Sequence, residues 1–164
     1  MKPTTRSVFL VSMFVLSGVA VAAAWLSDEE YERKVAEKEV PKAALEALKK
    51  QAAGAPLTQI EEEKEHGTTF YEGQWKGEHG RVEALVTSSG DLVEIEEEIA
   101  SDRLPVSVIA AAQKLAGADA KMKWEKKTQI LYEVKFKKGE SYHELLLTPD
   151  GRVVEHEDKS TDED

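Results

Sequence analysis

An internal repeat constrains the fold of this 164-residue chain more than any other feature of the sequence. A shift of 61 positions lays FYEGQWKGEHGRVEALVTSSGDLVEIEEE (residues 70–98) over LYEVKFKKGESYHELLLTPDGRVVEHEDK (residues 131–159) without a gap. Upstream, VPKAALEALKKQAAGA (residues 40–55) matches LPVSVIAAAQKLAGA (residues 104–118) at a slightly longer offset. Because a fixed-period match controls the assignment of a fold, we treat the chain as a tandem duplication.

Each copy begins with a pattern typical of a helix. Pro41 and Pro105 suit the first helical turn, where the missing amide donor is not needed. Gly54 and Gly117 stand where a left-handed residue would end the helix. Apolar residues recur on one helical stripe in each copy. The stripes are Val40, Ala44 and Leu48 in the first copy and Leu104, Val108, Ala111 and Leu115 in the second.

The period then changes to two, which indicates strands. Tyr71, Gly73 and Trp75 alternate with polar or smaller neighbours, as do Tyr132, Val134 and Phe136. Turns are predicted at KGEHG and SSGD in the first copy and at KKGES and PDGR in the second. An earlier strand is predicted over residues 58–64 and again over residues 122–127.

The predicted fold class is therefore α+β, with two tandem α-β-β-β-β units of hairpin-connected antiparallel strands. We place the first unit at residues 40–99 and the second at residues 100–157. A single unit of about 60 residues buries too little surface to be more than marginally stable. Two units that pack together or share a sheet would be more stable.

The N-terminus has the pattern of a secretory signal peptide. Lys2 and Arg6 precede the uncharged run VFLVSMFVLSGVAVAAAWL, and small residues allow cleavage after Ala22 or Ala24. An uncleaved membrane anchor is the competing interpretation, since the run is long enough to span a bilayer. We predict a signal peptide over residues 1–24 and a periplasmic or secreted protein. With no cysteine, the chain can be neither a lipoprotein nor disulfide-bonded.

The negative net charge of the chain argues against two classes of partner. Removal of residues 1–24 leaves 20 basic residues against 32 acidic ones, a net charge of −12. This argues against binding of nucleic acid or anionic membrane surfaces, which need basic patches. Contact with a membrane is expected only through an uncleaved N-terminal segment. The acidity suits solubility after export, and it would also suit a cationic partner.

Two segments lie outside the repeat. Residues 25–39 form a charged leader that we predict to be helical, with Ser27 as N-cap, Glu30 three residues later, and Leu26 packed on Tyr31. Residues 158–164, DKSTDED, are predicted to be a disordered acidic tail.

The second unit resembles the PepSY-like and beta-lactamase-inhibitor-like domains of exported bacterial proteins. The matching features are the apolar-Pro helix start, the helix ending in Gly, YEV on a strand, and TPDGRVVE on the last hairpin. The first unit matches the same scheme more loosely. The resemblance implies an exported α+β module that binds or inhibits another protein without catalysis. This chain lacks the cysteines and target-contact loops that would support inhibition of a particular beta-lactamase.

The sequence contains none of the common catalytic motifs that would indicate an enzyme. It has no G-x-S-x-G, no HExxH and no glycine-rich phosphate loop, and cysteine chemistry is excluded. We therefore predict no catalytic residue and no cofactor. His66 and His79 stand beside glycines in turn-like sequence, which predicts exposed loop positions.

His143 and His156 flank one hairpin and are weak candidates for a metal site. A two-residue loop of Asp150 and Gly151 would place them on one face, whereas a three-residue loop that includes Pro149 would place them on opposite faces. The Pro-Asp-Gly sequence favours the longer loop.

The acidic runs IEEEKE (residues 60–65) and VEIEEE (residues 93–98) could hold Ca²⁺ through clustered oxygens. Strand alternation sends neighbouring glutamates to opposite sides, so a solvated strand face is the favoured interpretation.

The aromatic residues suggest a binding surface. If Tyr71, Trp75, Tyr132 and Phe136 face the helices, their neighbours face outward and could bind an unknown exported protein or peptide. These candidate partner-binding residues are Phe70, Glu72, Gln74, Leu131, Glu133 and Lys135. The alternative is that the two sheets bury them against each other.

The predicted function is a non-catalytic binding module that could modulate or inhibit an exported enzyme. The alternative function is an acidic envelope or stress protein that binds Ca²⁺ or Zn²⁺.

Overall fold

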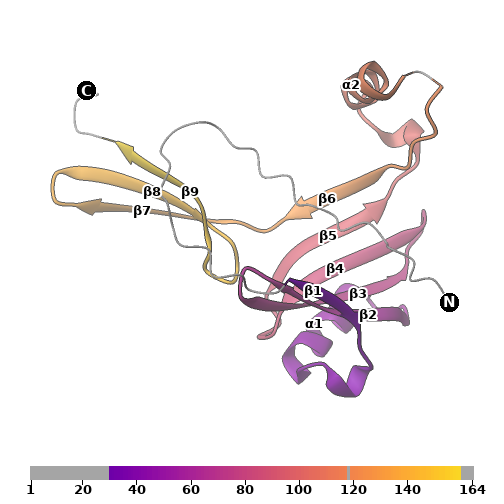
Figure 1. Ribbon diagram of the computed structural model, residues 1–164, viewed down its shortest axis with the longest axis horizontal. Coiled ribbons are helices and arrows are strands. Elements are labelled where there is room, and N and C mark those ends of the chain that lie inside the picture. The colour runs from indigo at the N-terminus through magenta and orange to yellow at the C-terminus, as the bar shows by residue number, and fades with distance from the viewer. Residues whose placement is uncertain (1–29, 118, 160–164) are drawn as a thin grey trace.

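The computed structural model describes residues 30–117 and 119–159, as shown in Figure 1. Its elements in chain order are β1 (Tyr31–Lys34), the 3₁₀ helix η1 (Glu37–Glu39), α1 (Lys42–Gln51), β2 (Leu57–Glu65), β3 (Thr68–Lys76), β4 (Arg81–Thr87), β5 (Leu92–Glu98), the 3₁₀ helix η2 (Ser101–Arg103), α2 (Val106–Ala116), β6 (Glu125–Gln129), β7 (Tyr132–Lys138), β8 (Ser141–Leu147) and β9 (Val153–Lys159). The predicted signal peptide lies outside the described residues.

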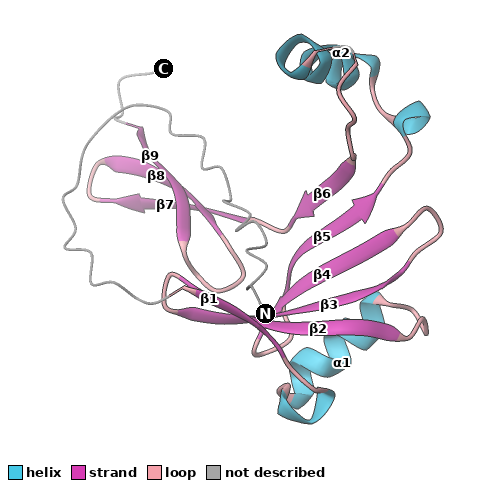
Figure 2. Ribbon diagram, turned by 45° about the vertical axis from the view of Figure 1, so that its right-hand side comes forward, coloured by secondary structure: helices cyan, strands magenta, loops and turns pink. Residues whose placement is uncertain are grey.

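The strands form two antiparallel sheets, which gives the predicted mixture of helix and antiparallel sheet. Strands β1 to β6 make a six-stranded sheet in sequence order, and β7 to β9 make a separate three-stranded sheet. Helix α1 covers one face of the larger sheet, while α2 lies far from β7–β9 in both views (Figures 1 and 2). Neither helix in the described part of the chain has the length and apolar character needed to cross a membrane.

The core lies between α1 and the larger sheet. Ala44 and Leu48 of α1 are fully buried in one cluster with Tyr71 and Trp75, as the helical stripe and the strand alternation predict. Gly73 lets the helix approach this closely, because a Cβ atom there would lie 3.0 Å from Leu48 Cδ2. The first copy of the repeat thus has a packed helix on a sheet.

The β4–β5 and β8–β9 hairpins have the same turn. In the first, the Gly90 amide donates to the Thr87 carbonyl oxygen at 2.9 Å; in the second, the Gly151 amide donates to the Thr148 carbonyl oxygen at 2.9 Å. Each glycine has a positive φ, +90° and +86°. An irregular register one residue pair further on adds an extra residue to β5 and to β9. Each hairpin therefore combines a three-residue loop with a β-bulge.

The second copy follows the predicted order of elements but not the predicted layout. Strand β6 pairs with β5, and it does not form a hairpin with β7. Helix α2 has no buried residue, although the stripe of Leu104, Val108, Ala111 and Leu115 is present in the sequence. The prediction of two equivalent helix-on-sheet units was therefore wrong for the second half of this structure.

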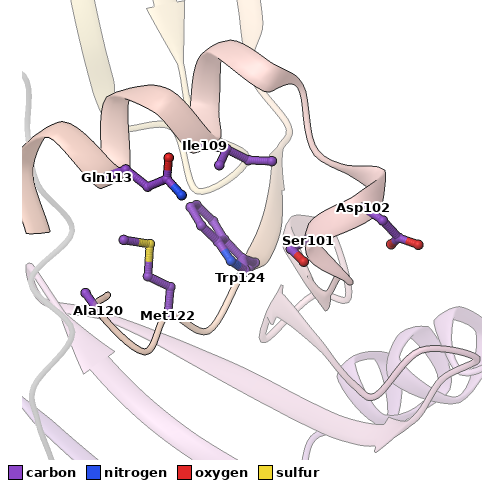
Figure 3. A pocket seen from close by; sticks show the side chains of 7 residues that line it. All are labelled: Ser101, Asp102, Ile109, Gln113, Ala120, Met122 and Trp124. Carbon is purple, nitrogen blue, oxygen red and sulfur yellow. The ribbon is translucent and has the colours of Figure 1, made fainter. Parts of the chain in front are cut away.

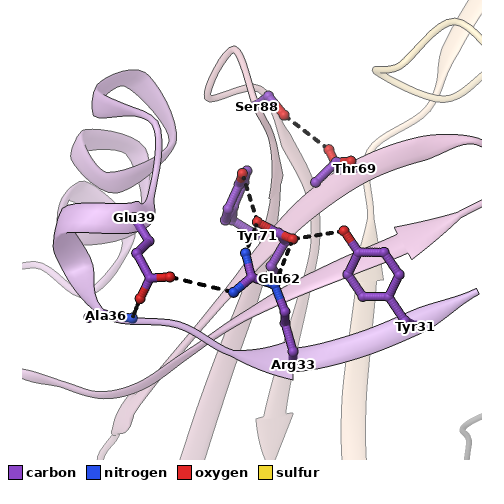
Figure 4. A network of polar contacts seen from close by, with 8 residues as sticks. All are labelled: Tyr31, Arg33, Ala36, Glu39, Glu62, Thr69, Tyr71 and Ser88. Carbon is purple, nitrogen blue, oxygen red and sulfur yellow. Dashed lines mark hydrogen bonds and ion pairs between the residues drawn. The ribbon is translucent and has the colours of Figure 1, made fainter.

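The charged leader is not helical where the structure describes it. Residues 31–34 form β1, which pairs with β2, and only Glu37–Glu39 make a short 3₁₀ turn. Tertiary contacts override the helical pattern, because Arg33 gives two hydrogen bonds to the buried carboxylate of Glu62, at 3.0 and 2.9 Å (Figure 4). Tyr31 and Tyr71 also donate to Glu62, at 2.8 and 3.3 Å.

Part of the segment predicted to be a disordered acidic tail belongs to a strand. Strand β9 runs to Lys159, so the first two of the seven tail residues belong to the three-stranded sheet. Residues 160–164 lie outside the described part of the chain.

Candidate functional site

Glutamates gather on the side of the larger sheet that faces away from α1. Tyr71 and Trp75 point toward the helix, so the alternate residue Glu72 points to the opposite side. The register places further glutamates of β2, β4 and β5 on the same side as Glu72. We call this set the glutamate face: Glu61, Glu63, Glu72, Glu83, Glu94 and Glu96.

Like charges lie directly opposite each other on this face. Glu61 pairs across the strands with Glu72, and Glu83 pairs with Glu96. Side chains in such positions have Cβ atoms about 5 Å apart, and like charges there are destabilising. A positively charged group of a partner would therefore have several carboxylates within reach on this face.

Cations of the chain offset part of this charge. Lys127 Nζ lies 2.7 Å from Glu94 Oε1 and 2.6 Å from Glu96 Oε1. Arg81 Nε lies 3.3 Å from Glu83 Oε2, and Gln74 donates to Glu83 Oε1 at 2.6 Å. Among the described residues, no lysine, arginine or histidine forms an ion pair with Glu72. The centre of the face is thus less neutralised than its β6 side.

Burial and mutual repulsion raise the pKa values of most of these carboxyl groups. Partial burial, followed by the charge of neighbouring glutamates, raises the pKa of Glu63 to about 7 and that of Glu72 to about 9. Burial also raises the pKa of Glu61, Glu83 and Glu94. For Glu96, burial acts in the same direction, but hydrogen bonds from Lys127 outweigh it and lower the pKa. The face therefore takes up protons readily near neutral pH.

The candidate partner-binding residues of the first copy are not all accessible. Glu72 and Gln74 belong to the outward side of the larger sheet. Phe70 points to the same side but is only 6% exposed, so its predicted place on an open surface was wrong. The β8–β9 turn lies beside this end of β3, where Thr68 donates a hydrogen bond to Asp150 at 3.4 Å.

The candidates of the second copy lie elsewhere. Leu131, Glu133 and Lys135 stand at or on β7, in or beside the smaller sheet. Lys135 Nζ is 2.8 Å from Glu133 Oε1 and 3.1 Å from Glu144 Oε1. The six candidates therefore do not form one continuous surface.

His143 and His156 lie on one face of the β8–β9 hairpin, which corrects the prediction that they lie on opposite faces. Their Nδ1 and Nε2 atoms are 3.1 Å apart, and His143 also stacks on Phe136. The three-residue loop is present, but the bulge at Val154 adds one residue to β9 and reverses its alternation. In the described residues, no group of three or more His, Asp or Glu side chains is arranged to hold a metal ion.

A pocket of about 320 Å³ lies between α2 and the segment that leads into β6 (Figure 3). Its lining residues are Ser101, Asp102, Ile109, Gln113, Ala120, Met122 and Trp124. Asp102 is the only ionisable residue among them. The pocket therefore offers no acid–base pair and no set of metal ligands.

The two acidic runs are visible in the sequence, but the glutamate face is not. The face depends on which residues of β2, β4 and β5 are opposite each other, and this register is set by the turns and by the bulge in β5. The signal available in the sequence was the alternation of glutamates with Ile60 and Ile95, which lie on the opposite, core-facing side.

Comparisons with known proteins give matches to solved structures only. No protein-family model and no curated protein matches the chain. A DUF2874 family protein from Bacteroides uniformis is 13% identical, with 76% of this chain and 93% of that chain covered and a TM-score of 0.45. A BLIP-like protein from Bacteroides fragilis is 17% identical, with 76% and 90% covered and a TM-score of 0.42. A DUF2874 family protein from Bacteroides ovatus is 16% identical, with 75% and 92% covered and a TM-score of 0.43.

Proposed function

We propose that this chain is an exported, non-catalytic binding module whose glutamate face takes a basic segment of another exported protein. The observation that carries the proposal is the direct opposition of Glu61 to Glu72 and of Glu83 to Glu96. Lysine or arginine side chains of a partner would stabilise the ionised carboxylates, so binding would be coupled to release of the protons that the face holds near neutral pH. The signal-peptide pattern of residues 1–24 supports a place in the periplasm or outside the cell.

An extended partner fits this surface best. Side chains on a strand alternate at a spacing of about 6.6 Å, so every second residue of an extended basic segment could meet a glutamate. The outward Gln74 adds a neutral hydrogen-bonding group beside Glu83. We expect affinity to fall steeply with ionic strength, because the contact relies on partly exposed charges.

The test is calorimetric titration of the full chain, purified after export, with a synthetic peptide of alternating lysine and threonine. The double variant Glu72→Gln/Glu83→Gln should bind at least tenfold more weakly than the wild type. The matched control is Glu46→Gln/Glu78→Gln, which replaces the same number of glutamates at exposed positions on α1 and in the β3–β4 turn. The control should bind within twofold of the wild type.

Equal weakening in both variants would mean that net charge alone attracts the peptide, and would contradict a specific face. Ca²⁺ or Zn²⁺ binding is the competing function, and a thermal-shift series separates it from peptide binding. A rise in Tm with millimolar Ca²⁺ that Glu72→Gln/Glu83→Gln abolishes, together with no peptide binding, would favour the cation.

A further inference from the structure

The link between β6 and β7 is shorter than its counterpart in the first copy. From Ala55 to Tyr71 the chain advances 16 positions, whereas from Ala118 to Tyr132 it advances 14. In the first copy this interval holds the β2–β3 hairpin. Its two-residue turn is His66 and Gly67, with φ of +50° and +80°. The second copy is therefore short by the length of this turn.

The second copy also lacks residues that could make such a turn. Residues 121–138 contain no Gly, Pro, Asn, Asp or Ser. Two-residue hairpin turns need positive φ values, which β-branched and bulky residues such as Ile130 and Leu131 adopt only with strain. In the structure, these two residues carry the chain directly from β6 in the larger sheet to β7 in the smaller one (Figure 1).

Because the chain does not turn back between β6 and β7, one edge strand of each sheet has an unpaired side. In the described part of the chain, β6 pairs only with β5 and β7 pairs only with β8. The other outer strands, β1 and β9, carry mainly charged residues, a common protection of edge strands. Strand β7 instead alternates apolar and charged residues, YEVKFKK, which suits pairing with another strand.

The apolar surface of the second copy is uncovered as well. Phe136 is 40% exposed, whereas its counterpart Trp75 is 7% exposed. On α2, Val106 is 81% and Leu115 is 90% exposed. Of the eleven large hydrophobic residues that are exposed in the described chain, ten lie in or next to α2, β7, β8 and β9. Such a concentration of apolar surface marks an interface.

The uncovered helix and the uncovered sheet are complementary in volume. In the first copy, Leu48 of α1 packs over Gly73 of β3. Alignment of Pro41 with Pro105 and of Tyr71 with Tyr132 replaces this pair by Ala112 on α2 and Val134 on β7. The large residue has moved from the helix to the strand, so α2 is shaped to pack on β7, although within one chain the two lie apart (Figure 2).

We propose that two copies of this chain exchange their C-terminal sheets, so that β7–β9 of one copy pairs along β6 and packs under α2 of the other. The exchange closes two equivalent interfaces about a two-fold axis, as expected for an isologous dimer. A shortened hinge loop is a known cause of domain swapping, because it prevents a segment from folding back on its own chain. The proposal concerns the edges of β6 and β7 and does not depend on the glutamate face.

The first test is the mass in solution of the full chain, purified after export, by size exclusion with light scattering. The wild type should have twice the mass of one chain. Insertion of Asn-Gly between Thr128 and Gln129 supplies the missing turn, so that variant should be a monomer. The control is the same insertion between Gly139 and Glu140, in the open β7–β8 turn, which should remain a dimer. A monomeric wild type, or a hinge insertion that stays dimeric, would overturn the exchange.

A disulfide test separates exchange from folding back within one chain. By the register of Glu63 with Phe70 in the first copy, Lys126 of β6 should lie opposite Leu131 of the partner copy. Within one extended chain these two positions are about 16 Å apart, too far for a disulfide. The chain has no cysteine of its own, so Lys126→Cys/Leu131→Cys can be oxidised cleanly. A covalent dimer on a non-reducing gel is expected. A covalently looped monomer, or free thiols in both copies, would overturn the proposal.

Discussion

Tyr71 and Tyr132 hold equivalent positions in the two copies of the repeat, yet Tyr71 is 6% exposed and Tyr132 is 57% exposed. Tyr71 belongs to the cluster formed by α1 and the larger sheet. Tyr132 stands on β7, from which α2 is distant (Figure 1). One chain thus contains a first unit whose helix packs on its sheet and a second unit whose helix and sheet are both exposed. The first unit shows which packing contacts the second lacks.

The packing of Leu48 on Gly73 can be tested by a double-mutant cycle. Gly73→Val should destabilise the protein by about 2 kcal/mol, because even a Cβ atom would lie 3.0 Å from Leu48. Leu48→Ala should cost about 3 kcal/mol, since the side chain is fully buried. The double variant reproduces the Ala112 and Val134 pair. It should be at least 1 kcal/mol more stable in urea denaturation than the sum of the single effects predicts. Strict additivity would contradict the equivalence of the two pairs.

The glutamate face predicts that stability falls as pH rises. The pKa of Glu63 is raised to about 7 and that of Glu72 to about 9 in the folded chain, from about 4.5 when unfolded. Between these values the folded state binds more protons than the unfolded state, so raising the pH from 5 to 8 lowers the free energy of unfolding. We expect a loss of about 1 kcal/mol, because water screens these partly exposed groups.

Glu72→Gln should flatten this pH dependence and raise stability at pH 8, measured by urea denaturation across the pH range. Glu46→Gln, on the exposed side of α1, is the control and should leave the slope unchanged. A wild type that is more stable at pH 8 than at pH 5 would contradict the assignment of raised pKa values.

Arg33→Ala should detach β1 and leave the carboxylate of Glu62 without its cation. Glu62 is buried, and the Arg33 guanidinium holds its pKa below the usual range. Removing one partner of a buried pair is costly, so the free energy of unfolding should fall clearly, although the loss is reduced because Arg33 is half exposed. Lys42→Ala breaks only an exposed pair with Glu46 and should change the free energy of unfolding by less than about 0.5 kcal/mol.

Gly90 and Gly151 form a matched pair in the two equivalent turns. Alanine at either position is strained by the positive φ, at a cost of about 1 kcal/mol. At Gly90 the new Cβ would also lie 2.7 Å from the Ala43 carbonyl oxygen of α1. Within one chain a Cβ atom at Gly151 would have no other atom within 4 Å. In the exchanged dimer α2 of the partner copy takes the place of α1, so Gly151→Ala should be as destabilising as Gly90→Ala in thermal unfolding.

The sequence predicted the elements that depend on local pattern. The stripe of Ala44 and Leu48, the inward alternation of Tyr71 and Trp75, and the strand at residues 58–64 are all present, because periodicity and burial agree there. The turns at Gly90 and Gly151 are also at the predicted places.

Three features did not follow from the periodicity of the sequence. Residues 31–34 form a strand because Arg33 meets Glu62, 29 positions away. His143 and His156 share a face because of a bulge in β9. The opposition of Glu83 and Glu96 follows from the register of β4 with β5. The first depends on a contact distant in sequence, and the other two depend on a β-bulge that shifts the register within one hairpin.

In the proposed exchange, the second copy of the repeat is completed by a second chain. The direct measurement is amide hydrogen exchange of β6 and β7 at several protein concentrations, because the edges that are open in one chain would be hydrogen-bonded in the dimer. We predict that the amides of Glu133 and Lys135, which alternate with the residues bonded to β8 and point to the open edge of β7, are protected at high protein concentration and exchange faster on dilution. Exchange rates in β6 and β7 that do not change with concentration, in a protein of single-chain mass, would contradict the claim.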